Sequence, residues 1–242
     1  AYLTISELFR SLSTSEVADP VKLVCLLHKV YQEVTQSNET LDDFYFWGEL
    51  LISDFDDADK NMADTRSLFS NLQELKGLMN DLTYMDKEQE EAIRQFFINF
   101  SIERRTALKE RFIFMWDVLG DIYTGFKNRL EAQGIAYEGM LYRQVMEALD
   151  TALLPYDTYV FVGFNVLNKV ERELFTHLRD AGKALFYWDY DEFYMAKEHH
   201  EAGVFIKRNL REYPSPLPAS LFNCMAKPKE INYISSPTEN AQ

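Results

Sequence analysis

The acidic residues around Asp57 have a spacing that first suggests a calcium-binding loop. If a loop began at Asp57, Asp59 and Asn61 would fall at its third and fifth positions. However, Met62 stands at the sixth position, where the sharp turn needs glycine, and Leu68 stands at the twelfth, where a bidentate glutamate is needed. The pattern therefore fails as a calcium site and indicates a solvated acidic end of a helix.

A second stretch imitates a phosphate-binding loop of the form G-x-x-x-x-G-K-[ST]. Gly120 and Gly125 have the required spacing, but Phe126 displaces Lys127 by one position and Asn128 replaces the hydroxyl residue. The stretch also lies inside a helical pattern, with no predicted strand before it. We therefore predict that this chain has no phosphate loop.

Two further patterns suggest metal-dependent chemistry, but neither has the geometry that such a site needs. His199 and His200 are adjacent, so on a helix their side chains point about 100° apart and cannot easily share one ion. A nuclease centre would place Glu-x-Lys on a strand, whereas Glu74 and Lys76 lie in a helical pattern. We therefore expect neither a metal site nor nuclease chemistry in these residues.

Helices must position most side chains in the first 154 residues, because apolar residues recur there at helical spacing. Asp19 and Pro20 form a cap followed by proline at the first helical position. Gly134 and Pro155 are expected to stop the last two helices of this part. The predicted helices cover 21–36, 41–60, 106–133 and 137–154, with another beginning at the acidic turn of 86–89.

After Pro155 the pattern changes to alternating strands and helices. Apolar runs rich in β-forming residues predict buried strands over 159–164 and 183–188, with a helix over 168–181 between them. Strand, helix and strand in this order predict a parallel unit. A further helix is expected over 199–213, and 231–234 is a candidate third strand. The predicted fold class is therefore mainly α with an α/β part.

The charge of the chain argues against a protein that coats nucleic acid with its whole surface. Its 25 Lys and Arg residues face 39 Asp and Glu residues, which gives a formal net charge of −14. The acidity is local, because 39–91 hold 15 acidic and 4 basic side chains, whereas 92–111 hold 5 basic and 2 acidic ones. The charge excludes a DNA-coating protein, but not a DNA-processing one.

Other features concern the compartment and the extent of the chain. Its 2 cysteines are too few for a disulfide framework. No stretch approaches the ~20 apolar residues of a membrane span, and no signal peptide opens the chain. We therefore expect a cytoplasmic protein without a membrane partner. Because the chain starts without Met and ends where we expect another element to begin, we also expect a piece of a longer protein.

The order of three segments resembles a known family. The segments are FYFWGELLISDFD at 44–56, GIAYEGMLYR at 134–143, and the apolar strand over 159–164. Together they resemble the AddB-type helicase-like subunit of bacterial helicase–nucleases, whose parent belongs to the PD-(D/E)XK nuclease family, and more distantly the UvrD-type superfamily 1 helicases. The alternative is a strand–helix–strand unit with an apolar core and no helicase ancestry.

The resemblance implies a division of the chain into three parts. Residues 1–18 would leave the first motor-like domain, and 19–133 would form a helical insert. Residues 134–242 would return into a helicase-like α/β domain with a partial parallel sheet. That domain would lack its phosphate loop and be truncated at its C-terminal end.

The resemblance also implies that the ATPase motifs are degenerate. The family's hydrolysis strand ends in Asp-Glu, which hold Mg²⁺ and orient the attacking water, and this chain has Val162 and Gly163 there. The next family motif, Gly-Asp-x-x-Gln, is matched by Asp189, with Glu192 in place of the glutamine. We therefore expect a non-catalytic module, with ATP and Mg²⁺ involved only if the parent supplies a phosphate loop.

The function implied by the resemblance is that of a scaffold and a track for single-stranded DNA. Its parent would be an ATP-dependent helicase/exonuclease component in DNA repair and recombination, working with a partner subunit. Such a track needs cations and aromatic side chains that stack on bases. The candidates are Arg104, Arg105, Lys109, Arg111, Lys207, Arg208, Arg211, Tyr142 and Trp188.

Each candidate has an alternative role. The cations also fit an ordinary solvated helix face, and Tyr142 and Trp188 also fit core packing. A function of another class is open as well, because the acidic helices of 39–91 would suit a protein-interaction module that docks a basic partner and has no nucleic-acid role.

Overall fold

A computed structural model of the chain describes residues 1–69, 105–195 and 201–230, with the backbone alone described for 105–117 and 201–202. The chain divides into two compact units, Ala1–Leu149 (unit 1) and Asp150–Gln242 (unit 2). The division lies close to the boundary expected near Pro155. Residues 134–149, which the resemblance assigned to the returning α/β domain, belong by their contacts to unit 1.

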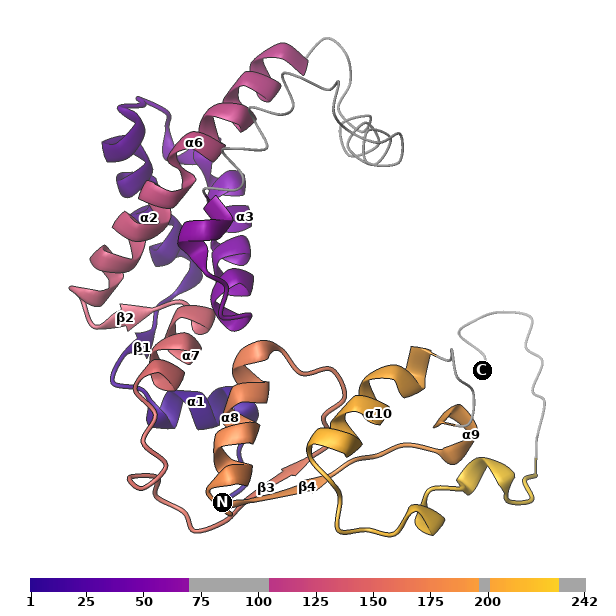
Figure 1. The fold of residues 1–242 in the computed structure, drawn as a ribbon. Coiled ribbons are helices and arrows are strands. Elements are labelled where there is room, and N and C mark those ends of the chain that lie inside the picture. The colour runs from indigo at the N-terminus through magenta and orange to yellow at the C-terminus, as the bar shows by residue number, and fades with distance from the viewer. Residues whose placement is uncertain (70–104, 196–200, 231–242) are drawn as a thin grey trace, which may run out of the picture. The chain divides into compact units, whose positions relative to one another are not determined.

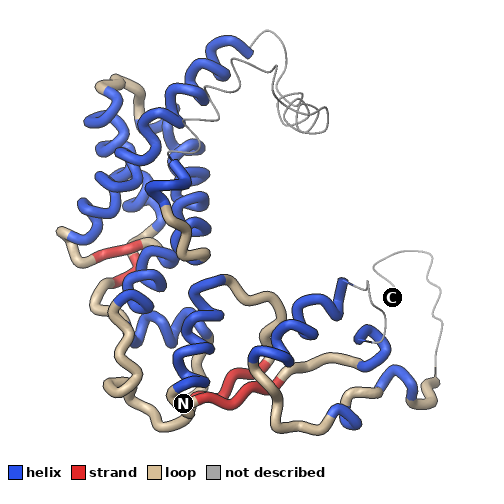
Figure 2. The backbone as a smooth tube through the Cα atoms, viewed as in Figure 1, coloured by secondary structure: helices blue, strands red, loops and turns tan. Residues whose placement is uncertain are grey.

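Unit 1 is built from helices and one short pair of parallel strands (Figure 2). Its strands pair in parallel, so the chain before α2 meets the chain before α7. The mainly helical character predicted for the first 154 residues is confirmed in the described part. The elements are α1 (Ile5–Leu12), β1 (Glu16–Val17), α2 (Pro20–Thr35), α3 (Leu41–Lys60), α6 (Arg105–Glu131), β2 (Ile135–Ala136) and α7 (Glu138–Glu147).

Capping residues explain where these helices begin and end. Asp19 accepts hydrogen bonds from two free amides of α2, at 2.9 and 3.3 Å, and Thr40 caps α3, which has the predicted bounds. The prediction of a helix over 137–154 is wrong at its C-terminal end, because α7 ends at Glu147. Beyond it, the Asp150 side chain accepts a hydrogen bond from the Ala152 amide, a local turn that competes with the helix.

The core of unit 1 lies where α2, α3 and α6 pack together (Figure 1). Phe44 and Phe55 of α3 are almost completely buried, and so is Phe126 of α6. The rings of Tyr31 and Phe44 stack with centroids 4.8 Å apart. These contacts fix the face of α3 on which its apolar residues lie.

Helix α7 packs against the C-terminal half of α3, and a glycine permits the two helices to approach closely. A Cβ atom at Gly139 would overlap the main-chain carbonyl oxygen of Asp56. The amide of Gly139 instead donates a hydrogen bond to the Asp56 carboxylate, at 2.5 Å. The α3–α7 contact therefore depends on a residue without a side chain at this position.

Unit 2 is organised around a parallel pair of strands. Tyr159 pairs with Ala184 and Val162 with Tyr187, as the strand–helix–strand pattern predicted. Its core is aromatic, with Phe161, Phe175 and Phe186 in mutual ring contact. The elements are β3 (Tyr159–Val162), α8 (Lys169–Asp180), β4 (Ala184–Tyr187), α9 (Glu192–Met195), α10 (Glu201–Glu212) and the short 3₁₀ helices η2 (Ala219–Leu221) and η3 (Cys224–Ala226).

The prediction that the first of these strands is buried on both faces is wrong for the described part of the chain. Tyr159 and Phe161 are buried, but Val160 and Val162 are 55% and 65% exposed. The reason is that Phe175 of α8 packs on Phe161, on the same face as Tyr159. The candidate third strand at 231–234 lies outside the described residues. Among the described helices, none combines the length and the hydrophobicity needed to cross a bilayer.

Candidate functional site

The carboxyl ends of β3 and β4 lie together because the two strands are parallel and in register. Val162 is the last residue of β3, and Gly163 follows with a φ of +82°, in the left-handed region that favours glycine. Asp189 follows β4 by two positions and is exposed. The structure thus brings to one end of the sheet three of the four positions that the resemblance matches to ATPase motifs. The fourth, Glu192, begins α9.

The side chains at this end do not fit a magnesium–nucleotide complex. Val162 presents aliphatic atoms and Gly163 has no side chain, so neither supplies an oxygen ligand for Mg²⁺. Asp189 retains a carboxylate, whereas Glu192 adds a negative charge that would repel phosphate. Within the described residues, no cluster of three or more His, Cys, Asp or Glu side chains is arranged to hold a metal ion.

The loop after β3 is held by a buried side chain of α10. Asn209 is fully buried, and its Nδ2 donates a hydrogen bond to the main-chain oxygen of Asn165, at 2.6 Å. A buried amide hydrogen bond of this kind fixes the loop because breaking it would leave polar groups unsatisfied. One side of α10 is therefore fixed to the loop at the end of the sheet, while its other side is exposed.

The exposed face of α10 carries the second group of DNA-binding candidates. Lys207, Arg208 and Arg211 lie within about one quadrant of the helix, opposite Asn209. Arg208 is exposed and pairs with Glu212 at 2.9 Å, and Arg211 is exposed as well. Sequence reasoning missed Phe205, an aromatic residue one turn before Arg208 that is 43% exposed.

The two aromatic candidates do not present their rings to solvent. Trp188 is 3% exposed, and its indole nitrogen donates a hydrogen bond to the main-chain oxygen of Tyr213, at 2.7 Å. Tyr142 is also 3% exposed and stacks on Phe9 with ring centroids 4.1 Å apart. Both rings are used in core packing, so neither is available to stack on a base.

The first group of basic candidates cannot be placed in the same way. Arg104 lies outside the described residues. The backbones of Arg105, Lys109 and Arg111 form the first turns of α6, but their side chains lie outside the described part of the structure. Their role in DNA binding stays a prediction from the sequence.

Unit 1 contains a buried carboxylate that sequence reasoning assigned wrongly to a solvated helix end. Asp59, near the end of α3, is fully buried. Its oxygens accept hydrogen bonds from the hydroxyl groups of Tyr123, at 2.6 Å, and Tyr137, at 2.5 Å. The cations of Lys127 and Arg143 lie 3.4 and 3.2 Å away. This cluster, the Asp59 cluster, joins α3, α6 and the start of α7.

Electrostatics keeps the two phenols of the Asp59 cluster in their neutral, donating form. Burial raises the pKa of Tyr123 and of Tyr137 above the ordinary value of 10.0, and the charge of the Asp59 carboxylate raises both further. Two hydroxyl donors and two cations therefore surround the Asp59 carboxylate. Together they offset the free energy cost of burying its charge.

A second polar cluster lies beside it and ties α7 to α1 and α3. Lys60 lies 2.8 Å from Asp56 and 2.9 Å from Glu138, which also accepts a hydrogen bond from Ser6. Burial lowers the pKa of Lys60, but the hydrogen bonds to both carboxylates outweigh it and raise that pKa above the ordinary value. Four of the nine residues in these two clusters, Asp56, Tyr137, Glu138 and Arg143, belong to 44–56 and 134–143, the segments that carry the resemblance.

Comparison with known proteins adds no relative from which roles can be transferred. A scan of protein-family models, a search of curated proteins and a search of solved structures found no match to this chain. The roles of the residues above are therefore argued from their positions and contacts.

Proposed function

We propose that this chain is a non-catalytic, helicase-like module of a bacterial helicase–nuclease for DNA double-strand-break repair. It would act as a scaffold and as a track for single-stranded DNA. The observation that carries the proposal is the parallel pairing of β3 with β4, which brings Val162, Gly163 and Asp189 to one end of the sheet. In open parallel sheets this end is where ligands bind, and the family that the sequence resembles holds its ATP and Mg²⁺ there.

The same positions support a non-catalytic role. The residues matched to the metal-binding aspartate and the water-orienting glutamate are Val162 and Gly163. ATP and Mg²⁺ would enter the function only through a phosphate loop elsewhere in the parent protein. We expect Mg-ATP to leave the melting temperature of the chain unchanged, whereas a saturable rise would contradict this part of the proposal.

The proposed path for DNA runs over the exposed face of α10. Lys207, Arg208 and Arg211 supply positive charge for the phosphates, and Phe205, one turn before Arg208 at the edge of this face toward Asn209, supplies a 43% exposed ring for stacking. Because Asn209 on the other side of α10 holds the loop after β3, the track is fixed to the end of the sheet. A rigid basic helix next to a sheet end without catalytic carboxylates suits binding rather than hydrolysis.

The experiment is a fluorescence anisotropy titration of the full chain with a labelled oligothymidine. If three cations neutralise phosphates, the logarithm of the affinity should fall with the logarithm of salt with a slope of about −2. Between about 50 mM and about 200 mM salt the affinity should therefore fall roughly 20-fold. Absence of binding at the lower salt would contradict the proposal.

A second candidate function, an acidic protein-interaction module, is favoured by the surface of α3. Its carboxylates at Asp42, Asp43, Glu49, Asp54 and Asp57 are exposed, and none of them forms an ion pair with a cation of the described residues. A basic partner would be attracted to this helix, whereas DNA would be repelled. Tight binding of a basic protein together with no binding of oligothymidine would favour this function over the first.

A further inference from the structure

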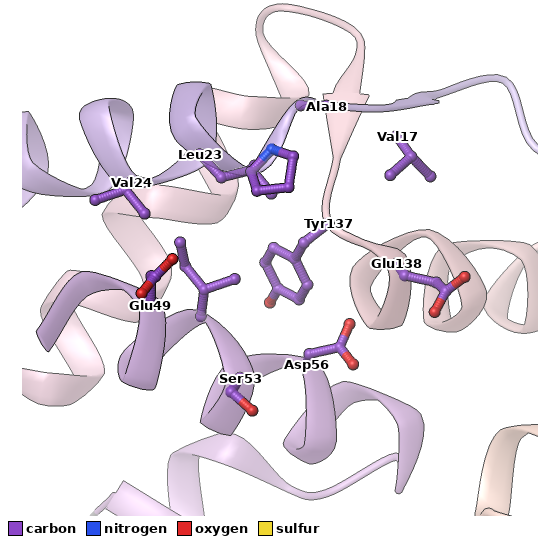
Figure 3. Close-up of a pocket in the computed structure, with 11 residues that line it drawn as sticks. Val17, Ala18, Leu23, Val24, Glu49, Ser53, Asp56, Tyr137 and Glu138 are labelled. Carbon is purple, nitrogen blue, oxygen red and sulfur yellow. The ribbon is translucent and has the colours of Figure 1, made fainter. Parts of the chain in front are cut away.

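A pocket of about 290 Å³ opens in unit 1 beside the ring of Tyr137 (Figure 3). Its walls come from the end of β1, the first turns of α2, one face of α3 and the start of α7. Most of the lining is aliphatic, including Val17, Leu23, Val24 and Ile52. The volume is at the lower end of the roughly 300–1,000 Å³ of small-molecule sites, so it suits one or two anchoring side chains.

Carboxylates surround this apolar space. Glu49, Asp56 and Glu138 line it, and Figure 3 shows Glu49 on one side of the Tyr137 ring and the other two on the opposite side. Asp56 and Glu138 share Lys60. Burial and the neighbouring Glu49 carboxylate raise the pKa of the Tyr45 hydroxyl, and Glu49 forms no ion pair with a cation of the described residues. Glu49 is therefore the charge at the rim that is best placed to receive a cation.

The apolar surface continues beyond the pocket. Phe46 lies one turn before Glu49 on α3 and is 71% exposed, and Val21, on the first turn of α2, is 53% exposed. Exposed apolar side chains that continue an apolar pocket and are rimmed by charge are typical of protein interaction sites.

We propose that this pocket and its rim dock a short segment of a partner protein in which a bulky apolar side chain is flanked by lysine or arginine. The apolar side chain enters the space beside Tyr137, and a flanking cation pairs with Glu49. The net negative charge of α3, with seven carboxylates and one lysine, attracts such a segment and repels a polyphosphate. The site lies wholly in unit 1, so the inference does not rest on the proposed DNA track of unit 2.

The test is a selection of short random peptides displayed on phage, with the full chain as the target. Selected peptides should combine a Leu, Phe or Met with neighbouring Lys or Arg. Enrichment of acidic peptides, or no enrichment, would overturn the proposal. A selected peptide, labelled and measured by anisotropy, then serves as the probe for variants.

Two exposed positions on α3 give a matched pair of variants. Glu49→Lys replaces an attraction at the rim by a repulsion and should weaken the peptide by at least about tenfold, which corresponds to about 1.4 kcal/mol. Asp54→Lys makes the same change on a side of α3 that does not line the pocket and should leave the affinity within about threefold. Equal weakening by both variants would show attraction to net charge alone and overturn the proposal.

A third variant tests the apolar anchor. Ser53→Phe places a ring at an exposed lining position and should weaken the selected peptide by about tenfold or more, without affecting the fold. Replacing the apolar residue of the peptide by serine should have a similar effect on the wild-type chain. Unchanged binding in both measurements would overturn the pocket as the docking site.

Discussion

Removing the buried carboxylate by Asp59→Ala should strongly destabilise unit 1. The substitution leaves the hydroxyl groups of Tyr123 and Tyr137 without their acceptor, at a cost of about 1–3 kcal/mol for each. The cations of Lys127 and Arg143 add less, because their side chains are 17% and 18% exposed and still reach water. Removing one member of a buried charged cluster costs about 3–5 kcal/mol in general, so we expect a loss of about 4 kcal/mol.

The assay is urea denaturation of the full chain followed by circular dichroism, with hydrogen exchange of α3 peptides to assign the transition to unit 1. In a thermal melt of the same variant, a loss of about 4 kcal/mol would lower the melting temperature by roughly 12 °C for a domain of this size. Asp57→Ala is the matched control, because Asp57 is exposed on the same helix and should change stability by less than about 0.5 kcal/mol.

A double-mutant cycle with Tyr137→Phe separates the hydrogen bond from the rest of the cluster. The single variant Tyr137→Phe removes one donor to Asp59, and its effect should shrink by about 1–2 kcal/mol in the Asp59→Ala background. The reasoning is refuted if Asp59→Ala costs less than about 1 kcal/mol, or if the effects of the two substitutions simply add.

Three further predictions follow from the contacts of both units. Gly139→Ala should destabilise unit 1 by about 1–3 kcal/mol in urea denaturation, because its Cβ overlaps the Asp56 carbonyl oxygen; wild-type stability would contradict the close approach of α7 to α3. Burial raises the pKa of Tyr123 and of Tyr137, and it raises the pKa of Tyr142 to about 12. The neutral forms of these phenols therefore stabilise unit 1 below pH 10.0, and this contribution should be lost as the pH rises further. In a titration of tyrosinate absorbance these phenols should ionise together with the loss of helical circular dichroism, and ionisation in the folded chain would contradict their burial. Trp188→Ala should destabilise unit 2 by about 3–5 kcal/mol, whereas Trp188→Phe, measured in the folded chain, should leave oligothymidine affinity within about twofold; a large loss with Trp188→Phe would show that the indole contacts DNA.

The elements of this fold could be predicted where local chemistry decides them. Thr40 and the apolar face of Phe44, Leu51 and Phe55 define α3 to the residue, and the apolar runs on either side of α8 predict the parallel β3–β4 pair. The pair β1–β2 could not be predicted, because two-residue strands have no periodicity and depend on contacts between Glu16–Val17 and Ile135–Ala136.

The position of the residues at the end of the β3–β4 sheet could be predicted from the sequence, but the burial of Asp59 and Trp188 could not. Parallel strands place their carboxyl ends together, so Val162 and Asp189 could be placed at one end from the pattern alone. Asp59 was misassigned because its neighbours in sequence are acidic, although it lies four residues after Phe55, on the apolar face of α3. That position was the available signal that the carboxylate is buried. The burial of Trp188 depends on Tyr213, 25 residues further along the chain.

Binding of single-stranded DNA by α10 can be measured by comparing two sets of substitutions. The anisotropy of labelled oligothymidine at low salt is measured with the wild-type chain and with Lys207→Gln, Arg208→Gln and Arg211→Gln combined. The control combines Lys169→Gln, Lys227→Gln and Lys229→Gln, which remove the same charge from exposed positions of unit 2 outside α10. We predict that the α10 variant loses at least about tenfold in affinity and about 2 in salt slope while the control stays within about threefold. Equal affinities of the two variants, or a wild-type chain that does not bind, would contradict binding of single-stranded DNA by α10.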